Sequence, residues 1–76
     1  MSEKHYDFVG KSYLIPFGVS VFGFGVTNPG HNEWLKPGTT FLVLSDSQTT
    51  GEYFTVLHLG LRYDISYSRL MDCREL

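Results

Sequence analysis

The stretch FGVSVFGFG, residues 17–25, constrains the fold of this chain more than any other segment. Val21 lies on one face of an extended chain, whereas Phe22 and Phe24 share the other face. The apolar phase therefore slips by one residue after Val21, and such a slip predicts a β-bulge. Beyond the slip, glycine alternates with phenylalanine, so the segment has one crowded face and one bare face. The bare face predicts close approach of a neighbouring strand, a large aromatic ring or the backbone of a ligand.

The length of 76 residues predicts one small domain over residues 1–76, with residues 1–4 frayed. A domain of this size buries too little surface to be very stable without additional support. Cys73 is the only cysteine, so no intrachain disulfide provides that support. The chain instead carries six phenylalanines, five tyrosines and one tryptophan, which predicts an unusually aromatic core.

Alternating apolar residues between glycine and proline signals predict about five short strands. Residues 39–45 are nearly all apolar, which predicts a central strand. Residues 52–67 form either two strands or one strand bent at Gly60. Residues 68–76 predict a turn or two of helix, with Ser68 as its N-cap. Two segments, residues 28–30 and 36–38, place proline before glycine and predict type II turns.

Short strands, tight turns and at most one short helix predict an all-β fold. A strongly coiled small barrel suits such a chain, because closure removes exposed sheet edges. The order of elements resembles that of the SH3-like small barrels: strands, one longer loop, a closing strand and a short C-terminal helical turn. That resemblance implies a scaffold used for peptide binding, RNA binding or toxin activity, and the fold alone does not choose among them.

No motif of a known catalytic or cofactor-binding loop is present. Gly18 and Gly23 have the spacing of a phosphate-binding loop, but Phe24 and Gly25 follow instead of Lys and Ser/Thr. His5 with Asp7, and His31 with Glu33, have the spacing of metal-ligand pairs on an extended chain, yet nothing in the sequence brings the two pairs together. We therefore predict no metal and no cofactor.

The loop between the two proline–glycine turns is the predicted partner-binding site. It carries Trp34, a residue type enriched at the energetic centres of interfaces, with His31, Asn32 and Glu33 as polar companions. An exposed edge near residues 17–26 would add Phe24 and allow strand pairing with a partner or a second copy. Trp34 is also compatible with a lid on an undersized core.

Two other functions remain open from the sequence. Tyr53, Tyr63 and Tyr67 share one alternation and would form either the core or a row that stacks nucleic-acid bases. The basic residues available for phosphates in that case are Lys11, Lys36, Arg62 and Arg69. A small-barrel ribonuclease would use His58, Arg62 and Asp64, which share the other alternation.

The charge balance favours protein over nucleic acid as the partner. Six basic and eight acidic residues give a net charge of −2, whereas phosphate-binding domains carry a basic stripe. The N-terminal residues MSEKHYDFVGK lack an apolar run, so no signal peptide and a cytoplasmic location are predicted. The sequence thus predicts a non-catalytic module, of the small phage or mobile-element type, that inhibits or adapts a host protein by covering its surface.

Overall fold

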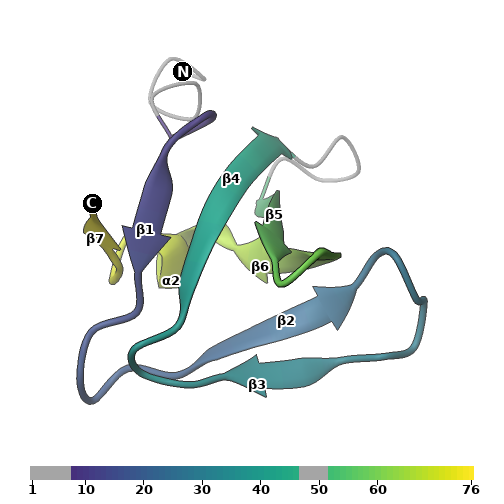
Figure 1. The fold of residues 1–76 in the computed structure, drawn as a ribbon, viewed down its shortest axis with the longest axis horizontal. Helices are drawn as coiled ribbons and strands as arrows, with labels where there is room; N and C mark the ends of the chain where they lie inside the picture. Colours follow the sequence, from purple (N-terminus) through teal and green to yellow (C-terminus); the bar gives the residue numbers. More distant parts are fainter. Residues whose placement is uncertain (1–7, 47–51) are drawn as a thin grey trace.

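In a computed structural model, which describes residues 8–46 and 52–76, one antiparallel sheet of seven strands curls into a half-barrel (Figure 1). The order of strands across the sheet is β3-β2-β6-β5-β4-β1-β7. The elements are β1 (Ser12–Leu14), β2 (Val21–Gly25), β3 (Glu33–Leu35), β4 (Thr40–Asp46), β5 (Tyr53–His58), β6 (Leu61–Ser66), α2 (Tyr67–Leu70) and β7 (Arg74–Glu75). The predicted all-β coiled fold with a short helical turn is confirmed, but the described residues form seven strands where about five were predicted.

One of the additional strands lies where the sequence predicted a loop. Glu33–Leu35 forms β3, which pairs antiparallel with β2 and places Trp34 opposite Phe22. The flanking type II turns are present as predicted: His31 N–H donates to Asn28 O (2.9 Å), and Thr39 N–H donates to Lys36 O (3.1 Å). The stretch between these turns is long enough to return along β2 as a hairpin.

The second additional strand replaces most of the predicted C-terminal helix. Helix α2 has only four residues, and its N-cap is Ser66 rather than Ser68, since the Ser66 hydroxyl accepts the N–H of Arg69 at 3.2 Å. Beyond the helix, Arg74–Glu75 pairs with β1 as β7. The predicted helix does not continue to residue 76, and Leu70 is the buried residue of the single turn that forms.

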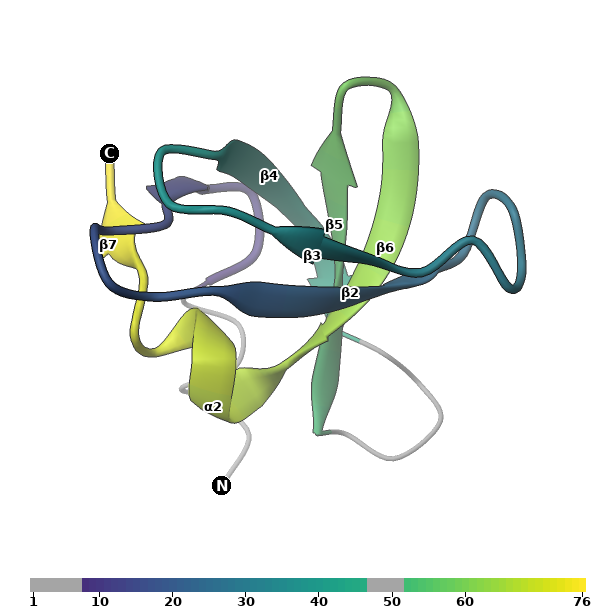
Figure 2. The ribbon, with the colours of Figure 1, turned by 90° about the horizontal axis from the view of Figure 1, so that it is seen from below.

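Strand β2 curls by dividing its pairing between two neighbours. Its first three residues pair with β3 and its last two pair with β6, so the β2–β3 hairpin crosses the β5–β6 hairpin steeply (Figure 2). The pairing of β2 with β3 is regular, so the bulge predicted after Val21 is wrong. The irregularity lies in β4 instead, where the register shifts between Val43 and Ser45.

The segment of residues 52–67 is two strands joined by a two-residue turn. His58 lies opposite Leu61, and the turn residues Leu59 and Gly60 have φ angles of 52° and 80°. Positive φ at both central residues is the geometry of a type I′ hairpin turn, in which asparagine and glycine are favoured. A leucine there is unusual, and this leucine is also 87% exposed.

The concave side of the half-barrel holds the core. Its buried residues are Tyr13, Ile15, Val21, Leu35, Phe41, Val43, Phe54, Val56, Tyr63, Ile65 and Leu70. The central position of β4, between β1 and β5, is confirmed. No helix in the described part of the chain is long and apolar enough to cross a membrane. The predictions for residues 1–4, His5 and Asp7 fall outside the described residues.

Candidate functional site

Four aromatic rings form a continuous patch on the convex side of the sheet, which we call the aromatic face: Phe22, Phe24, Trp34 and Tyr53. Their ring centroids are 5.0 Å apart for Phe22–Trp34, 4.9 Å for Phe22–Phe24 and 5.8 Å for Phe24–Tyr53. All three contacts are edge-to-face, a favourable arrangement of aromatic rings. Trp34 and Phe24 are 61% and 42% exposed, so the patch presents large apolar area to solvent.

The alternation of β2 explains why these rings face outward. Phe22 and Phe24 point to the convex side, whereas Val21 and Gly23, which alternate with them along the strand, are buried. Gly23 needs no side chain because Tyr63 fills the space beneath it. The bare face predicted for residues 17–25 is therefore the inner face of β2. A large aromatic ring, that of Tyr63, approaches this face as predicted.

Two members of the aromatic face, Phe22 and Tyr53, were not among the predicted site residues. Phe22 shares its alternation with Phe24, so the sequence contained a signal for it. Tyr53 comes from β5, two strands away from β2 in the sheet, and no local pattern predicts its contact with Phe24.

The predicted polar companions of Trp34 do not surround its ring. Glu33 precedes Trp34 in β3 and lies opposite the buried Gly23, so its side chain points to the other face of the strand. There it contacts His31, with Nε2 and Oε1 3.3 Å apart, and accepts a hydrogen bond from the Tyr63 hydroxyl. Burial of the Tyr63 ring raises the pKa of its hydroxyl, and the negative charge of Glu33 raises this pKa further.

Asn32 stabilises the β2–β3 hairpin. Its Oδ1 accepts the backbone N–H of Gly25 at 3.0 Å, which ties β3 to the end of β2. A Cβ atom on Gly25 would overlap the carbonyl oxygens of Asn28 and His31, so glycine is required at that position. Of the five predicted site residues, the structure thus brings Trp34 and Phe24 onto one surface and places Asn32, Glu33 and His31 around the adjoining turn.

The sequence suggested a row of three tyrosines, but the structure separates them. The turn at Leu59 and Gly60 interrupts the alternation, so Tyr63 points into the core while Tyr53 lies on the aromatic face. Tyr67 begins α2 and packs against Phe8 and Phe54, with ring centroids 5.7 Å and 5.8 Å away. The interpretation of these tyrosines as one stacking row is therefore wrong.

The same turn separates the residues suggested for a ribonuclease. His58 lies opposite Leu61, whereas Arg62 lies opposite Leu57, so the imidazole and the guanidinium belong to different faces of the hairpin. Asp64 accepts a hydrogen bond from the Thr55 hydroxyl at 2.7 Å. The suggested acid–base constellation is not assembled.

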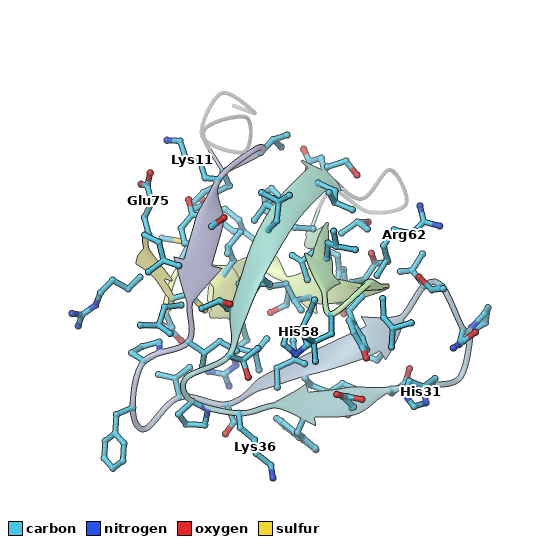
Figure 3. All side chains as sticks on the ribbon, viewed as in Figure 1. Lys11, His31, Lys36, His58, Arg62 and Glu75 are labelled. Atoms are coloured by element: carbon cyan, nitrogen blue, oxygen red, sulfur yellow. The ribbon has the colours of Figure 1, made fainter. Side chains whose placement is uncertain are left out.

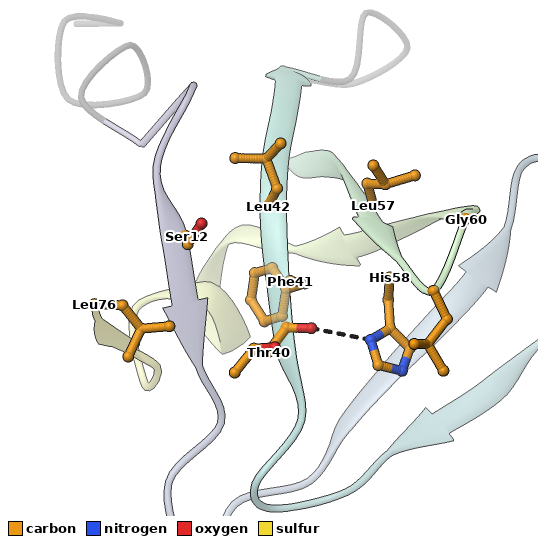
Figure 4. Close-up of a pocket in the computed structure, with 9 residues that line it drawn as sticks. Ser12, Thr40, Phe41, Leu42, Leu57, His58, Gly60 and Leu76 are labelled. Carbon is orange, nitrogen blue, oxygen red and sulfur yellow. Dashed lines mark hydrogen bonds between the residues drawn. The ribbon is translucent and has the colours of Figure 1, made fainter.

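His58 instead borders a shallow pocket of about 330 Å³ (Figure 4). Its Nδ1 lies 2.9 Å from Thr40 O, and since a carbonyl only accepts, Nδ1 carries the proton in this contact. The pocket crosses β4 between Leu76 and Leu57, and its lining contains no Asp, Glu, Lys or Arg side chain.

The basic residues are spread over the molecule. Lys11, Lys36 and Arg62 lie on separate sides (Figure 3). Lys11 pairs with Glu75 at 3.8 Å, and Arg69 pairs with Asp72 at 3.4 Å. Within residues 8–46 and 52–76, no three His, Cys, Asp or Glu side chains gather as metal ligands. The described residues therefore form neither a basic stripe nor a metal centre.

Comparison of the chain with protein-family models, with curated proteins and with solved structures gives no significant match.

Proposed function

We propose that this chain is a non-catalytic protein-binding module whose partner covers the aromatic face. The observation that supports this proposal is the continuous contact of four rings with Trp34 and Phe24 exposed at its surface. Large rings braced by one another lose little conformational freedom on binding and bury much apolar area. Contiguous exposed apolar patches of this kind mark interaction sites on monomeric proteins.

The order of elements supports an SH3-like barrel as part of this proposal. A hairpin, β2–β3, separates the first strand from the central strand, and a helical turn precedes a last strand that pairs with the first. In this proposal the module is a cytoplasmic inhibitor or adaptor, of the type that phages and mobile elements encode, which acts by occupying a surface of a host protein.

Single-strand nucleic-acid binding is the alternative, because exposed rings also stack bases. Two carboxylate-bearing residues argue against it: Asp64 lies directly opposite Phe24, and Glu52 precedes Tyr53. Two of the four basic residues suggested for phosphate contacts, Lys11 and Arg69, already form ion pairs with acidic residues. A phosphate backbone laid along the rings would thus meet negative charge.

The test is a tagged pull-down from lysate, with and without nuclease, read by mass spectrometry. A dominant protein that survives nuclease and is lost with Trp34→Ala supports the proposal. Phe17→Ser is the matched control, since Phe17 is 99% exposed but lies on a turn outside the aromatic face. Recovery that depends on nucleic acid and collapses at physiological salt would favour the alternative.

A further inference from the structure

The aromatic face extends from the edge of the sheet toward its centre. The edge is β3, since no strand of the described residues pairs with its other side. The prediction of an edge at residues 17–26 is therefore wrong, because β2 is flanked by β3 and β6. Phe24 belongs to the part of β2 that pairs with β6, so the rings continue across β6 to Tyr53 in β5.

A carboxylate lies among these rings on the same side of the sheet. Asp64 in β6 lies directly opposite Phe24 in β2 and Thr55 in β5. Directly opposite residues of antiparallel strands point to the same face, so Asp64 shares the convex side with Phe24 and Thr55. Tyr53, two residues before Thr55, also faces this side. The Asp64 side chain is thus half-buried beside the aromatic face.

Within the described part of the chain, no cation pairs with Asp64. Its Oδ1 accepts the Thr55 hydroxyl at 2.7 Å, which uses one of about four acceptor positions on the carboxylate. Arg62 precedes Asp64 by two residues on the same side, but no ion pair of the described residues joins the two. The Arg62 side chain lies at the rim of the molecule (Figure 3).

A partner that covers the aromatic face also covers Asp64. Taking a carboxylate out of water without a cation beside it is costly, so the partner has to bring a positive charge to this position. Arginine fits better than lysine for two reasons. Its planar guanidinium forms two parallel hydrogen bonds with a carboxylate, and it also packs against aromatic rings.

We infer that the partner is a protein that places an arginine side chain on the aromatic face, with its guanidinium on the Asp64 carboxylate and its stem against Phe24. The inference rests on the proposed function, since it names the chemistry of the partner at the same surface. Asp64 then also discriminates among partners, because a phosphate or an acidic segment would meet a like charge there.

The test uses the peptide N-acetyl-Leu-Arg-Leu-amide, titrated into the isotope-labelled protein and followed by NMR. The backbone amides of Phe24, Thr55 and Asp64 should shift together, with a dissociation constant on the order of 1 mM, as expected for one side chain and its neighbours. The same peptide with citrulline keeps the shape of arginine without its charge. It should bind at least about fivefold more weakly.

Asp64→Asn is the matched change in the protein. The asparagine side chain keeps an oxygen that can accept the Thr55 hydroxyl, so the fold and its stability should be preserved. The arginine peptide should bind this variant at least about fivefold more weakly. Asp72→Asn is the control, since it removes the same charge from a residue that follows α2 and pairs with Arg69. It should leave peptide binding unchanged.

No shift of these amides at millimolar peptide would overturn the inference. So would equal binding of the arginine and citrulline peptides, a lysine peptide that binds as tightly, or an Asp64→Asn variant that binds as well. A captured protein that is lost with Trp34→Ala but kept by Asp64→Asn would contradict the arginine and leave the proposed function standing. Tighter binding of a single-stranded oligothymidylate at the same amides would overturn both.

Discussion

Gly23 and Tyr63 fit against each other in the core: a Cβ atom added to Gly23 would lie 3.1 Å from Cδ2 of the tyrosine ring. This contact allows β2 to cross the β5–β6 hairpin closely enough to curl the sheet. It also explains why glycine lies among the most apolar residues of the chain. A larger residue there would separate the two hairpins.

Gly23→Val should therefore destabilise the protein by about 1–3 kcal/mol, the usual cost of overpacking a core. Gly23→Ala should cost less, because the ring needs to move only a few tenths of an ångström. Urea denaturation measures both changes in the free energy of unfolding. Thr40→Val introduces the same β-branched side chain at an exposed strand position without adding bulk, and should have little effect. Unchanged stability of Gly23→Val would show that the close approach does not determine the curl.

Leu59→Asn should stabilise the protein by about 1 kcal/mol, because asparagine tolerates the left-handed backbone that strains leucine. The change also removes an apolar side chain that is 87% exposed. Phe17→Asn is the control, since it removes a similar exposed group from a residue without positive φ. If thermal unfolding shows that Leu59→Asn lowers stability, the contacts of the leucine side chain stabilise the protein by more than its backbone strain destabilises it.

Trp34→Ala should change the free energy of unfolding by less than about 1.5 kcal/mol, the range of a cross-strand aromatic pair. Tyr63→Ala, which empties a buried site, should cost about 3–5 kcal/mol. Because Trp34 is the only tryptophan, intrinsic fluorescence reports on it directly. We expect solvent-exposed emission and efficient quenching by acrylamide. An unfolded Trp34→Ala variant would mean that this ring belongs to the core.

Stability should fall as the pH rises above about 10, the pKa of an unperturbed tyrosine. Burial of Tyr63, and Glu33 beside it, raise the pKa of its hydroxyl in the folded state. The unfolded chain then loses its proton first, so the stabilisation is complete below the unfolded pKa and is lost above it. Urea midpoints between pH 8 and pH 11 measure this loss.

Cys73 contributes to this alkaline loss in the same direction. Burial, with a smaller effect from Asp72, raises the pKa of its thiol from 9.0 to about 11. The loss of stability caused by Cys73 should therefore begin near pH 9, at a lower pH than the loss caused by Tyr63. Cys73→Ala should remove the earlier part of the loss, and Tyr63→Phe should remove the later part. If the urea midpoint of the unmodified protein did not change between pH 8 and pH 11, the roles given to Cys73 and Tyr63 would both be wrong.

The sequence predicted those features that depend on neighbouring residues. The type II turns follow from proline before glycine, and the central strand β4 follows from its continuous apolar run. The tail was harder to predict, because the helix predicted over residues 68–76 is outweighed by the pairing of β7 with β1. That pairing joins opposite ends of the chain, and local patterns do not contain it.

The candidate site was predicted in the same uneven way. Trp34 and Phe24 were identified by residue type, and both lie on the aromatic face. Glu33, the predicted companion of Trp34, lies on the opposite face because side chains alternate along β3. No local pattern indicates that this segment is a strand. Tyr53 joins the patch only through sheet order, which is a property of the whole fold.

The turn at Leu59 has a consequence for the speed of folding. It closes the β5–β6 hairpin, the most local strand pairing among the described residues, whereas Tyr13 and Glu75 pair across nearly the whole chain. Local pairings form early, so the hairpin belongs to the expected folding nucleus. Leu59→Asn should therefore accelerate refolding more than it slows unfolding, which a chevron plot separates. The strained residue would then limit how fast the native fold is reached as well as how stable it is.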